Sequence, residues 1–305
     1  MTIEEKLKTI QLLSNLTQTQ LAIKLKVSFP TLNSWINGKS TPHTGKIKKI
    51  DDLYTELSGQ KTIPKDNLSS KKDILKRKST KHKDIIKTIL SRPDIYNQLV
   101  LSLTYNSNSI EGSTLTESDT AAIIFENQTL KNKDLIEHIE AKNHQTAMEF
   151  LFNNMKKNFK ISEDFILEMH KMLMNSIRDD AGRYRNHGVR IVGANVSTAN
   201  YLKVHKLMKE LIDEINEAHK DLIQHISKIH SKFEQIHPFS DGNGRIGRLI
   251  MVAMLLRKSY APAIIKQEKK KLYYKYLQKS QQKGEFEDLE EFICDSIIDG
   301  FRIFE

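Results

Sequence analysis

One short stretch, residues 237–248, gathers the residue types that phosphate chemistry requires. It reads HPFSDGNGRIGR and is followed by an apolar run over residues 249–256. Its glycines allow backbone N–H groups to approach an anion closely, and a helix beginning near Arg245 would point the positive end of its dipole there. Arg245 and Arg248 are three residues apart, which places both guanidinium groups on one helical face. The stretch therefore predicts a phosphate site at a helix start.

Two further side chains of this stretch suit a metal ion and a base. Bound phosphates would repel the Asp241 carboxylate unless Mg²⁺ lay between them, because Mg²⁺ is usually held by one or two carboxylates plus phosphate oxygens. His237 is a base that titrates near neutral pH. The forked donors of the two arginines suit polyphosphate oxygens. The alternative is a capped turn before a core helix that carries two surface arginines.

The twelve residues resemble the signature of the Fic family, His-x-Phe-x-Asp/Glu-Gly-Asn-Gly-Arg-x-x-Arg, and fill every position of it. The resemblance implies a mainly α fold, a Fic-type helical bundle with a short β-hairpin flap. It implies a protein adenylyltransferase that moves AMP from ATP to a Ser, Thr or Tyr hydroxyl of a target protein or of itself. His237 would be the catalytic base and Asp241 the Mg²⁺ ligand. The residues implied at the ATP phosphates are Gly242, Asn243, Gly244, Arg245 and Arg248.

A second motif lies upstream, where residues 107–112 read SNSIEG. It resembles the inhibitory helix of many Fic proteins, Ser/Thr-x-x-x-Glu-Gly/Asn, although the bare pattern also describes a helix that ends at a C-cap glycine. The resemblance implies an inhibitory helix around residues 103–112 that acts through Ser107, Glu111 and Gly112. If Glu111 pairs with Arg248, that guanidinium cannot hold the γ-phosphate of ATP.

Two further segments are assigned by the same resemblance. Short β-branched runs around Gly-Ala-Asn predict a hairpin over residues 189–196, where the Fic flap would hold the target as an added strand. The family often shows a Pro-Pro pair after the flap, whereas residues 198–201 read TANY. Tyr273 lies in an aromatic segment that would approach the nucleotide base, with core packing as the alternative. The expected flap residues are Val189, Arg190, Ile191, Val192 and Gly193.

Residues 1–57 predict short helices joined by tight turns. Thr17 suits the N-cap of one helix, and Ser28 suits that of the next, with Pro30 in its first turn. The order of Gln18, Leu21-Ala22, Val27-Ser28, Trp35, Asn37-Gly38-Lys39 and Pro42 resembles the Cro/repressor helix-turn-helix family.

That resemblance implies DNA as a partner of the N-terminal domain. The helix over residues 29–36 would enter the major groove, and Trp35 would belong to the small core. The alternative is a helical docking module that binds protein, because fold does not fix function. The base-facing candidates are Phe29, Thr31, Asn33 and Ser34, and the candidates near phosphates are Gln18 and Lys39.

The basic residues are concentrated in one part of the chain. Residues 1–90 carry 18 Lys and Arg against 8 Asp and Glu, and residues 91–305 carry 30 against 30, so the net charge of +10 lies in the first 90 residues. Such a segment indicates an anionic polymer or surface as its partner, with a solvated basic linker as the alternative. We expect a helix-turn-helix domain over 1–57, a basic linker over 58–87 and a Fic domain over 88–305.

The compartment can also be predicted from composition. Cys294 is the single cysteine, which excludes an internal disulfide and favours a reducing compartment. Residues 1–10 do not read as a secretory signal, and the longest apolar run falls far short of the roughly 20 residues that cross a bilayer. We expect a cytoplasmic protein with no membrane segment. The sequence leaves a homo-oligomer open.

Three other activities remain open at this point. Glu111 could align a water that removes AMP from a modified protein. Nucleotide binding could instead set the DNA affinity of a transcriptional regulator that transfers nothing. The donor could also carry UMP or phosphocholine, because the motif contacts phosphates and says little about the group carried.

Overall fold

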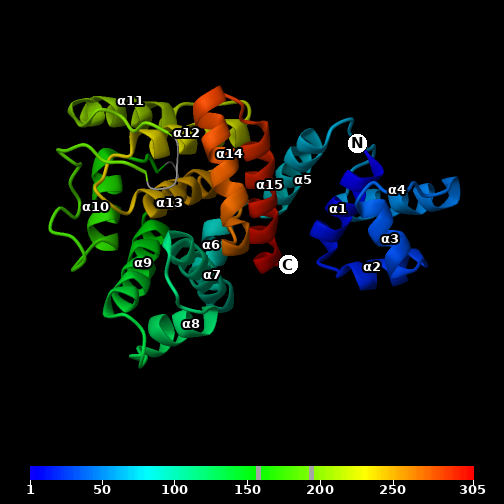
Figure 1. The fold of residues 1–305 in the computed structure, drawn as a ribbon, viewed down its shortest axis with the longest axis horizontal. Coiled ribbons are helices and arrows are strands. Elements are labelled where there is room, and N and C mark those ends of the chain that lie inside the picture. The colour runs from blue at the N-terminus through cyan, green and yellow to red at the C-terminus, as the bar shows by residue number, and fades with distance from the viewer. Residues whose placement is uncertain (156–158, 192–195) are drawn as a thin grey trace. The chain divides into compact units, whose positions relative to one another are not determined.

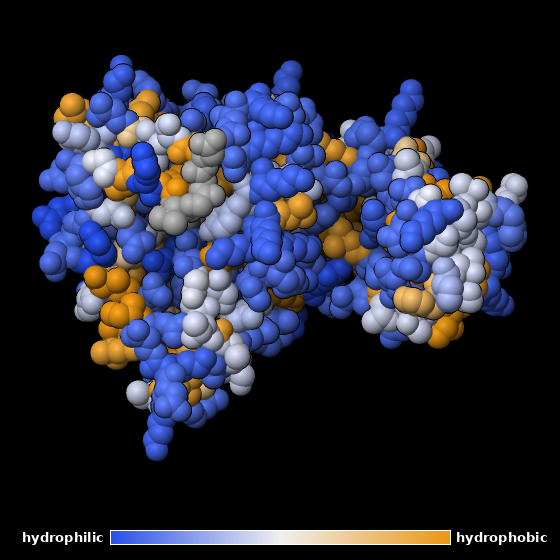
Figure 2. Space-filling model, viewed as in Figure 1, coloured by the Kyte–Doolittle hydropathy of each residue, from blue (hydrophilic) through white to orange (hydrophobic). Residues whose placement is uncertain are grey.

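The computed structural model describes residues 1–155, 159–191 and 196–305, and every regular element within these ranges is a helix (Figure 1). The mainly α fold that we expected is therefore confirmed. The chain folds as two compact units, Met1–Lys78 and Ser79–Glu305. Figure 2 shows a largely hydrophilic surface with scattered apolar side chains, because most large apolar residues lie in the cores. In the described ranges, no helix is both long and apolar enough to cross a membrane.

The first unit is a small helical bundle around one apolar core. Thr17 closes a capping box with Gln20, and the Ser28 hydroxyl accepts from the Thr31 N–H at 3.3 Å, so both expected N-caps are present. Trp35 is 6% exposed and belongs to the core, as expected. The helices are α1 (Ile3–Ser14), α2 (Gln18–Leu25), α3 (Phe29–Ile36) and α4 (Thr44–Ser58).

The segment expected as a basic linker, residues 58–87, contains a helix of its own. Helix α5 (Asn67–Lys81) occupies half of it. The buried hydroxyl of Tyr54 donates to Gln60 Oε1 at 2.7 Å, and Gln60 Nε2 donates to the Ser70 carbonyl at 3.1 Å. Two apolar residues of α5, Ile74 and Leu75, are buried. The many lysines of this segment obscured these two apolar positions and the polar contacts, which is why a helix was not expected.

The second unit is a larger bundle built around one buried helix, α13. Every residue of α13 from Arg245 to Leu256 is buried, and the helix packs against α7, α9, α10 and α12. A helix that is apolar all round belongs in a core. The helices of this unit are α6 (Ile85–Ser91), α7 (Pro93–Glu111), α8 (Glu117–Glu126), α9 (Leu135–Asn154), α10 (Glu163–Leu173), α11 (Val204–Asn216), α12 (Leu222–Ile236), α13 (Asn243–Leu256), α14 (Lys270–Lys283) and α15 (Glu287–Phe301), with 3₁₀ turns η1 (Tyr201–Lys203), η2 (Gln267–Lys269) and η3 (Arg302–Phe304).

The expected β-hairpin is not seen. The described part of that segment, residues 189–191 and residue 196, forms no strand, while Val192 and Gly193 lie outside the described residues. The Thr198 hydroxyl donates to the Val189 carbonyl at 2.8 Å and joins the two ends of the segment. A side chain thus makes a contact that a ladder of backbone hydrogen bonds would make in a hairpin.

Helix α15 passes so close to residues 261–263 that only glycine fits at position 300. A Cβ atom built on Gly300 would lie 2.0 Å from the Pro262 carbonyl oxygen. Nearby, the Ile264 N–H donates to the Ser296 carbonyl at 2.9 Å, which fixes the two segments together. The absence of a side chain at position 300 therefore sets the distance between them.

We predict that Gly300→Ala lowers the thermal unfolding midpoint by several degrees. Alanine gains about 1 kcal/mol of helix propensity, but forcing the two segments apart costs about 1–3 kcal/mol and also weakens the packing around them. Gly188→Ala is the control, because nothing lies within 4 Å of a Cβ atom there. Equal midpoints for the two variants would contradict the close approach.

Candidate active site

The loop between α12 and α13 is held by its own residues and by two residues from elsewhere in the chain. Asn243 donates to the Phe239 carbonyl and accepts from the Phe239 N–H, both at 2.9 Å, so its side chain shapes the loop. Phe239 is fully buried and stacks on the His170 ring at a centroid distance of 3.7 Å. His170 accepts from the Gly182 N–H at Nδ1, so its Nε2 carries the hydrogen that faces the Asp241 carbonyl at 3.1 Å. Burial lowers the pKa of His170 to about 4, which keeps the ring neutral.

Arg185 is the second distant residue that supports the loop. It is 3% exposed, and its Nε donates to the His237 carbonyl at 2.7 Å. Its other nitrogens donate to the carbonyls of His187 and Ala199, each at 2.6 Å. One guanidinium therefore holds the start of the loop and both ends of the segment expected as the flap. This role was not predicted, because Arg185 precedes His237 by 52 residues.

His237 is presented as a neutral base. Its backbone has a φ of 51° at the C-cap of α12, which turns the chain into the loop. Its Nδ1 lies 3.2 Å from the Glu234 carbonyl, and because a carbonyl only accepts, Nδ1 must carry the hydrogen. Burial lowers the pKa of His237 below its usual value. The imidazole is therefore uncharged at neutral pH, with a free lone pair on Nε2.

The start of α13 carries a carboxylate from another helix. Gly242 has a φ of +75° and offers no side-chain cap to the first turn of α13. A Cβ atom built on Gly244 would lie 2.3 Å from Glu111 Oε1 and 3.1 Å from Arg248 Nη1. The Glu111 carboxylate thus occupies the space that the missing side chain leaves at the positive end of the helix dipole. The space at the start of α13 where we expected phosphate, here called the cradle, holds an anion of the chain itself.

Arg248 holds the end of α7 through Glu111, the partner expected for it, and through Ser107, whose contact with Arg248 was not expected. Its side chain is 9% exposed, and Nη2 lies 2.7 Å from Glu111 Oε1. Nε donates to the Ser107 hydroxyl at 2.9 Å, and Nη2 donates to the Ser107 carbonyl at 3.0 Å. Gly112 then ends α7 with a φ of 116°. Burial would raise the pKa of Glu111, but the charge of Arg248 and its hydrogen bond hold that pKa below its usual value.

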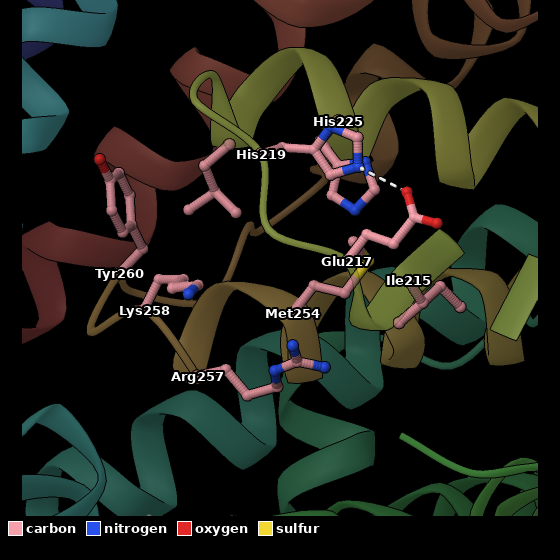
Figure 3. A pocket seen from close by; sticks show the side chains of 9 residues that line it. Ile215, Glu217, His219, His225, Met254, Arg257, Lys258 and Tyr260 are labelled. Atoms are coloured by element: carbon pink, nitrogen blue, oxygen red, sulfur yellow. Dashed lines mark ion pairs between the residues drawn. The ribbon is translucent and has the colours of Figure 1, made fainter. Parts of the chain in front are cut away.

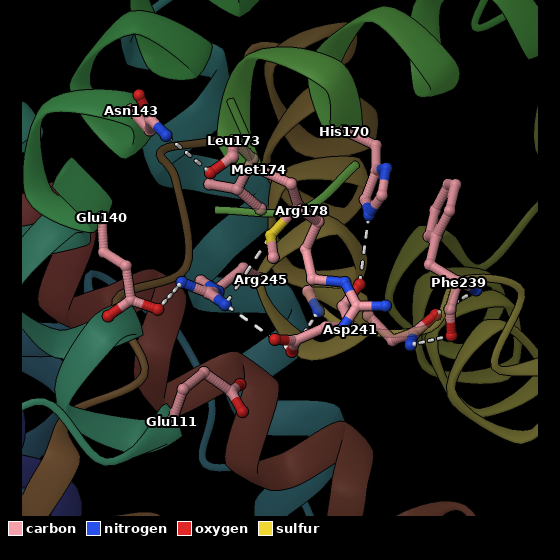
Figure 4. A network of polar contacts seen from close by, with 12 residues as sticks. Glu111, Glu140, Asn143, His170, Leu173, Met174, Arg178, Phe239, Asp241 and Arg245 are labelled. Atoms are coloured by element: carbon pink, nitrogen blue, oxygen red, sulfur yellow. Dashed lines mark hydrogen bonds and ion pairs between the residues drawn. The ribbon is translucent and has the colours of Figure 1, made fainter. Parts of the chain in front are cut away.

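Arg245 lies beside the cradle, between two carboxylates (Figure 4). Nη1 is 2.6 Å from Glu140 Oε1, and Nη2 is 3.7 Å from Asp241 Oδ1. The Arg245 side chain is 2% exposed, whereas that of Asp241 is 53% exposed. Asp241 Oδ1 also accepts from the Gly242 N–H at 2.6 Å. Glu140 was not predicted, since nothing in its sequence neighbourhood on α9 indicates an arginine 105 residues away.

The donor set fits Mg²⁺ only together with phosphate oxygens. In the described part of the chain, no group of three or more His, Cys, Asp or Glu side chains could hold a metal ion. Asp241 offers an exposed carboxylate beside the start of α13. One carboxylate beside a polyphosphate site is a usual arrangement for Mg²⁺, which keeps several waters.

Tyr273 lies in the core of the second unit. It is 1% exposed, and its hydroxyl lies 2.6 Å from His230 Nε2. Tyr273 is therefore packed in the core in this structure, as the alternative to contact with a nucleotide base predicted. The neighbouring Tyr274 is 39% exposed.

The six residues proposed for DNA contact lie on the surface of the first unit. On α3, Leu32, Trp35 and Ile36 face the core and leave the other side of the helix partly exposed. Phe29 is 46% exposed, although it is a large apolar residue. The exposed or partly exposed candidates are Gln18, Phe29, Thr31, Asn33, Ser34 and Lys39.

A cavity of about 280 Å³ lies at the far end of α13 (Figure 3). Arg257 and Tyr260 line it together with the rings of His219 and His225, which stack at a centroid distance of 3.7 Å. Arg257 Nη1 donates to Asn216 Oδ1 at 2.9 Å. Because α13 is roughly 20 Å long at about 1.5 Å per residue, this cavity is separate from the phosphate cradle.

Glu234 is a buried carboxyl group behind the cradle. It is 6% exposed, and burial raises its pKa to about 8, against the opposing effect of Arg248. Gly247 leaves the space for it, because a Cβ atom there would lie 2.5 Å from Glu234 Oε1. Glu234 is therefore uncharged at neutral pH, so it does not compete with Glu111 for an ion pair with Arg248.

We predict that Glu234→Gln becomes more stable relative to the wild type as the pH rises. Between the usual carboxyl pKa of 4.5 and about 8, the folded state keeps a proton that the unfolded state loses. Each pH unit in this window lowers the wild-type free energy of unfolding by about 1.4 kcal/mol. The difference between the two proteins should therefore grow by about 2 kcal/mol from about pH 6 to about pH 8 in urea titrations.

The difference isolates Glu234, because buried histidines contribute equally to both proteins. Glu210→Gln, an exposed substitution on α11, serves as the control and should show no such trend. A stability difference that stays constant with pH would contradict a neutral Glu234.

Comparison with known proteins agrees with these two units. Residues 160–255 match the Fic/DOC family, and residues 7–55 match a helix-turn-helix family. The chain is 34% identical over 178 residues to the protein adenylyltransferase Fic of Nematostella vectensis, which covers 57% of this chain and 41% of that protein. It is 29% identical over 234 residues to the protein of the same name from Drosophila erecta, with 75% and 45% covered. The chain thus spans less than half the length of these relatives.

Solved structures share the fold. A Fic-domain signalling protein from Bacteroides thetaiotaomicron has a TM-score of 0.65 at 24% identity, and the match covers 76% of this chain and 94% of that one. A Fic family protein from Desulfovibrio desulfuricans has a TM-score of 0.64 at 25% identity, with 79% and 74% covered. The arrangement of helices around α13 is therefore that of the Fic fold.

Proposed function

Because residues 160–255 are a Fic/DOC-family domain and residues 7–55 a helix-turn-helix domain, we propose that this chain is a protein adenylyltransferase linked to DNA binding. One observation carries the proposal. The start of α13 brings together a neutral imidazole, a glycine-lined cradle and two buried arginines. Relatives with the printed name protein adenylyltransferase support the same chemistry.

The proposed reaction uses ATP as the donor. Nε2 of His237 accepts the proton of a target Ser, Thr or Tyr hydroxyl, and the oxygen attacks the α-phosphorus. A bond forms between that oxygen and phosphorus, the bond to the bridging oxygen breaks, and pyrophosphate leaves. The backbone N–H groups of residues 242–244 and the guanidiniums of Arg245 and Arg248 bind the phosphates. Mg²⁺ held by Asp241 and phosphate oxygens would supply charge neutralisation.

We also propose that Glu111 restrains this activity. Its carboxylate lies against Gly244 and pairs with Arg248 at 2.7 Å, so it occupies space and charge that the γ-phosphate would need. A buried guanidinium is strongly destabilised without an anion, so Glu111 leaves only when the phosphate replaces it. The end of α7 therefore moves, or the triphosphate binds with its α-phosphorus out of line.

The target segment is proposed to bind beside the loop. Val189, Arg190 and Ile191 belong to the segment whose ends Arg185 and Thr198 hold near His237. An extended target chain could align there through its backbone. The same position could accept another part of this chain, in which case the protein would modify itself.

We predict that Glu111→Gly raises AMP transfer by roughly tenfold or more, because each 1.4 kcal/mol of competition removed is worth about a factor of ten. The measurement is labelling of protein in a cell lysate with ATP labelled at its α-phosphate. Glu126→Gly, at the exposed end of α8, is the matched control and should behave like the wild type. Equal or lower labelling by Glu111→Gly would contradict the inhibitory role.

The same assay separates the competing activities. Glu111→Gly combined with His237→Ala should bind ATP and label nothing, and persistent labelling would remove His237 as the base. If the protein instead removes AMP, AMP-modified protein should lose its label with wild type and keep it with Glu111→Gly. Parallel reactions with donors labelled in their UMP or phosphocholine group show which group the protein transfers.

We predict that the full chain binds duplex DNA and that its affinity falls by about tenfold or more between about 50 and 200 mM salt, because phosphate contacts release counterions. Lys39→Ala should reduce the salt slope by about one. Lys8→Ala, an exposed lysine on α1, removes the same charge and should leave the slope unchanged. A salt-insensitive or absent shift in fluorescence anisotropy would favour a protein-docking module.

A further inference from the structure

Asp241 lies beside two arginines, yet each of these is held more closely by a different carboxylate. Arg245 is 2.6 Å from Glu140 and 3.7 Å from Asp241. Arg178 binds Asp180 through two contacts of 3.0 and 3.3 Å. Figure 4 shows the Arg245 guanidinium between the Glu140 and Asp241 carboxylates. The carboxylate of Asp241 stays 53% exposed in this setting.

The Arg245 pair is the more consequential of the two, because this guanidinium is buried. The Arg245 side chain is 2% exposed, and the Glu140 side chain is 19% exposed. A guanidinium out of contact with water requires an anion close by. If Glu140 lost its charge, the carboxylate within reach would be Asp241, which lies in the loop before α13, 3.7 Å from Arg245.

Helix α9, which carries Glu140, is fixed to the turn on the other side of the Arg245 guanidinium. Its Asn143 donates to the carbonyls of Leu173 and Asn175 at 3.1 and 2.8 Å. Those bonds fix the turn that carries Met174, whose sulfur is 3.8 Å from Arg245 Nη2. The guanidinium is thus enclosed by α9 on one side and by this turn on the other.

We propose that Glu140 is a positioning residue that holds Arg245 toward α9 and so keeps the Asp241 carboxylate free for a divalent cation. The inference rests on the proposed function only in assigning that cation to Asp241. Without the charge of Glu140, Arg245 closes the 3.7 Å gap to Asp241. The guanidinium then competes with the cation for the Asp241 carboxylate, and the cation binds more weakly.

Direct binding of Mn²⁺ to the full chain tests this proposal. Mn²⁺ is titrated in the presence of a saturating non-hydrolysable ATP analogue, and free Mn²⁺ is read by its paramagnetic resonance signal. Glu140→Gln should weaken Mn²⁺ binding by roughly three- to tenfold, the size of coupling expected between contacting groups. Glu140→Asp, which keeps the charge, should restore most of the affinity. Glu149→Gln, an exposed substitution on the same helix, is the matched control and should have no effect.

A double-mutant cycle separates positioning from a general structural effect. If Glu140 acts through Asp241, Glu140→Gln should change nothing further in an Asp241→Asn background. Equal weakening in both backgrounds would overturn the proposal, as would unchanged Mn²⁺ binding by Glu140→Gln alone. If Asp241→Asn itself leaves Mn²⁺ binding unchanged, the assignment of the cation in the proposed function fails instead.

A second pair of variants covers the case in which Glu140→Gln does not fold. Arg245→Gln removes the buried charge that Glu140 compensates, so its combination with Glu140→Gln leaves no unpaired guanidinium. The double variant should bind Mn²⁺ with the affinity of Arg245→Gln alone. A further loss of affinity would show that Glu140 acts on the cation without Arg245 and would overturn the proposal.

Discussion

A guanidinium that is shielded from water needs an anion beside it, and for Arg248 that anion is the carboxylate of Glu111. The contact joins the last turn of α7 to the first turns of α13, helices that are separated by more than 130 residues in the chain. It also fills the space that Gly244 leaves open at the positive end of a helix dipole. The chain thus pairs the buried Arg248 with an internal carboxylate at the start of α13. Any ligand that binds there competes with an ion pair that is already formed.

The same logic extends to the other charged groups around the loop. Arg245 has Glu140, Arg178 has Asp180, and the buried Glu234 stays neutral and leaves Arg248 to Glu111. Each of these three arginines therefore has a carboxylate partner within the chain. A buried guanidinium without such an anion would be strongly destabilised. An anionic ligand that binds these arginines must therefore replace a carboxylate that already pairs with them.

Local sequence patterns were sufficient to predict the parts of this structure that depend on neighbours in the chain. Each of these features depends on residues that are close in sequence. They are the caps at Thr17 and Ser28, the glycines at residues 242 and 244, and the end of α7 at Gly112. Glu111 with Arg248 was predicted through a resemblance between motifs, since spacing alone would not pair residues so far apart. Arg185, Glu140 and His170 could not be predicted, because the loop and α13 groups that they bind lie 52 or more residues away. Helix α5 was not predicted, because its lysines outnumber the two apolar residues, Ile74 and Leu75, that it buries.

Arg185 has a mechanical consequence. Its single guanidinium bonds to the carbonyl of His237 and to those of His187 and Ala199, and it is almost fully buried. A planar group with fixed donor directions transmits displacement, because moving one acceptor obliges the group to tilt or to lose a bond. Tension on the segment around residues 187–199 would therefore reach the backbone of the proposed base directly. A displacement of the chain at His187 or Ala199 would therefore also shift the His237 imidazole, because one guanidinium binds all three carbonyls.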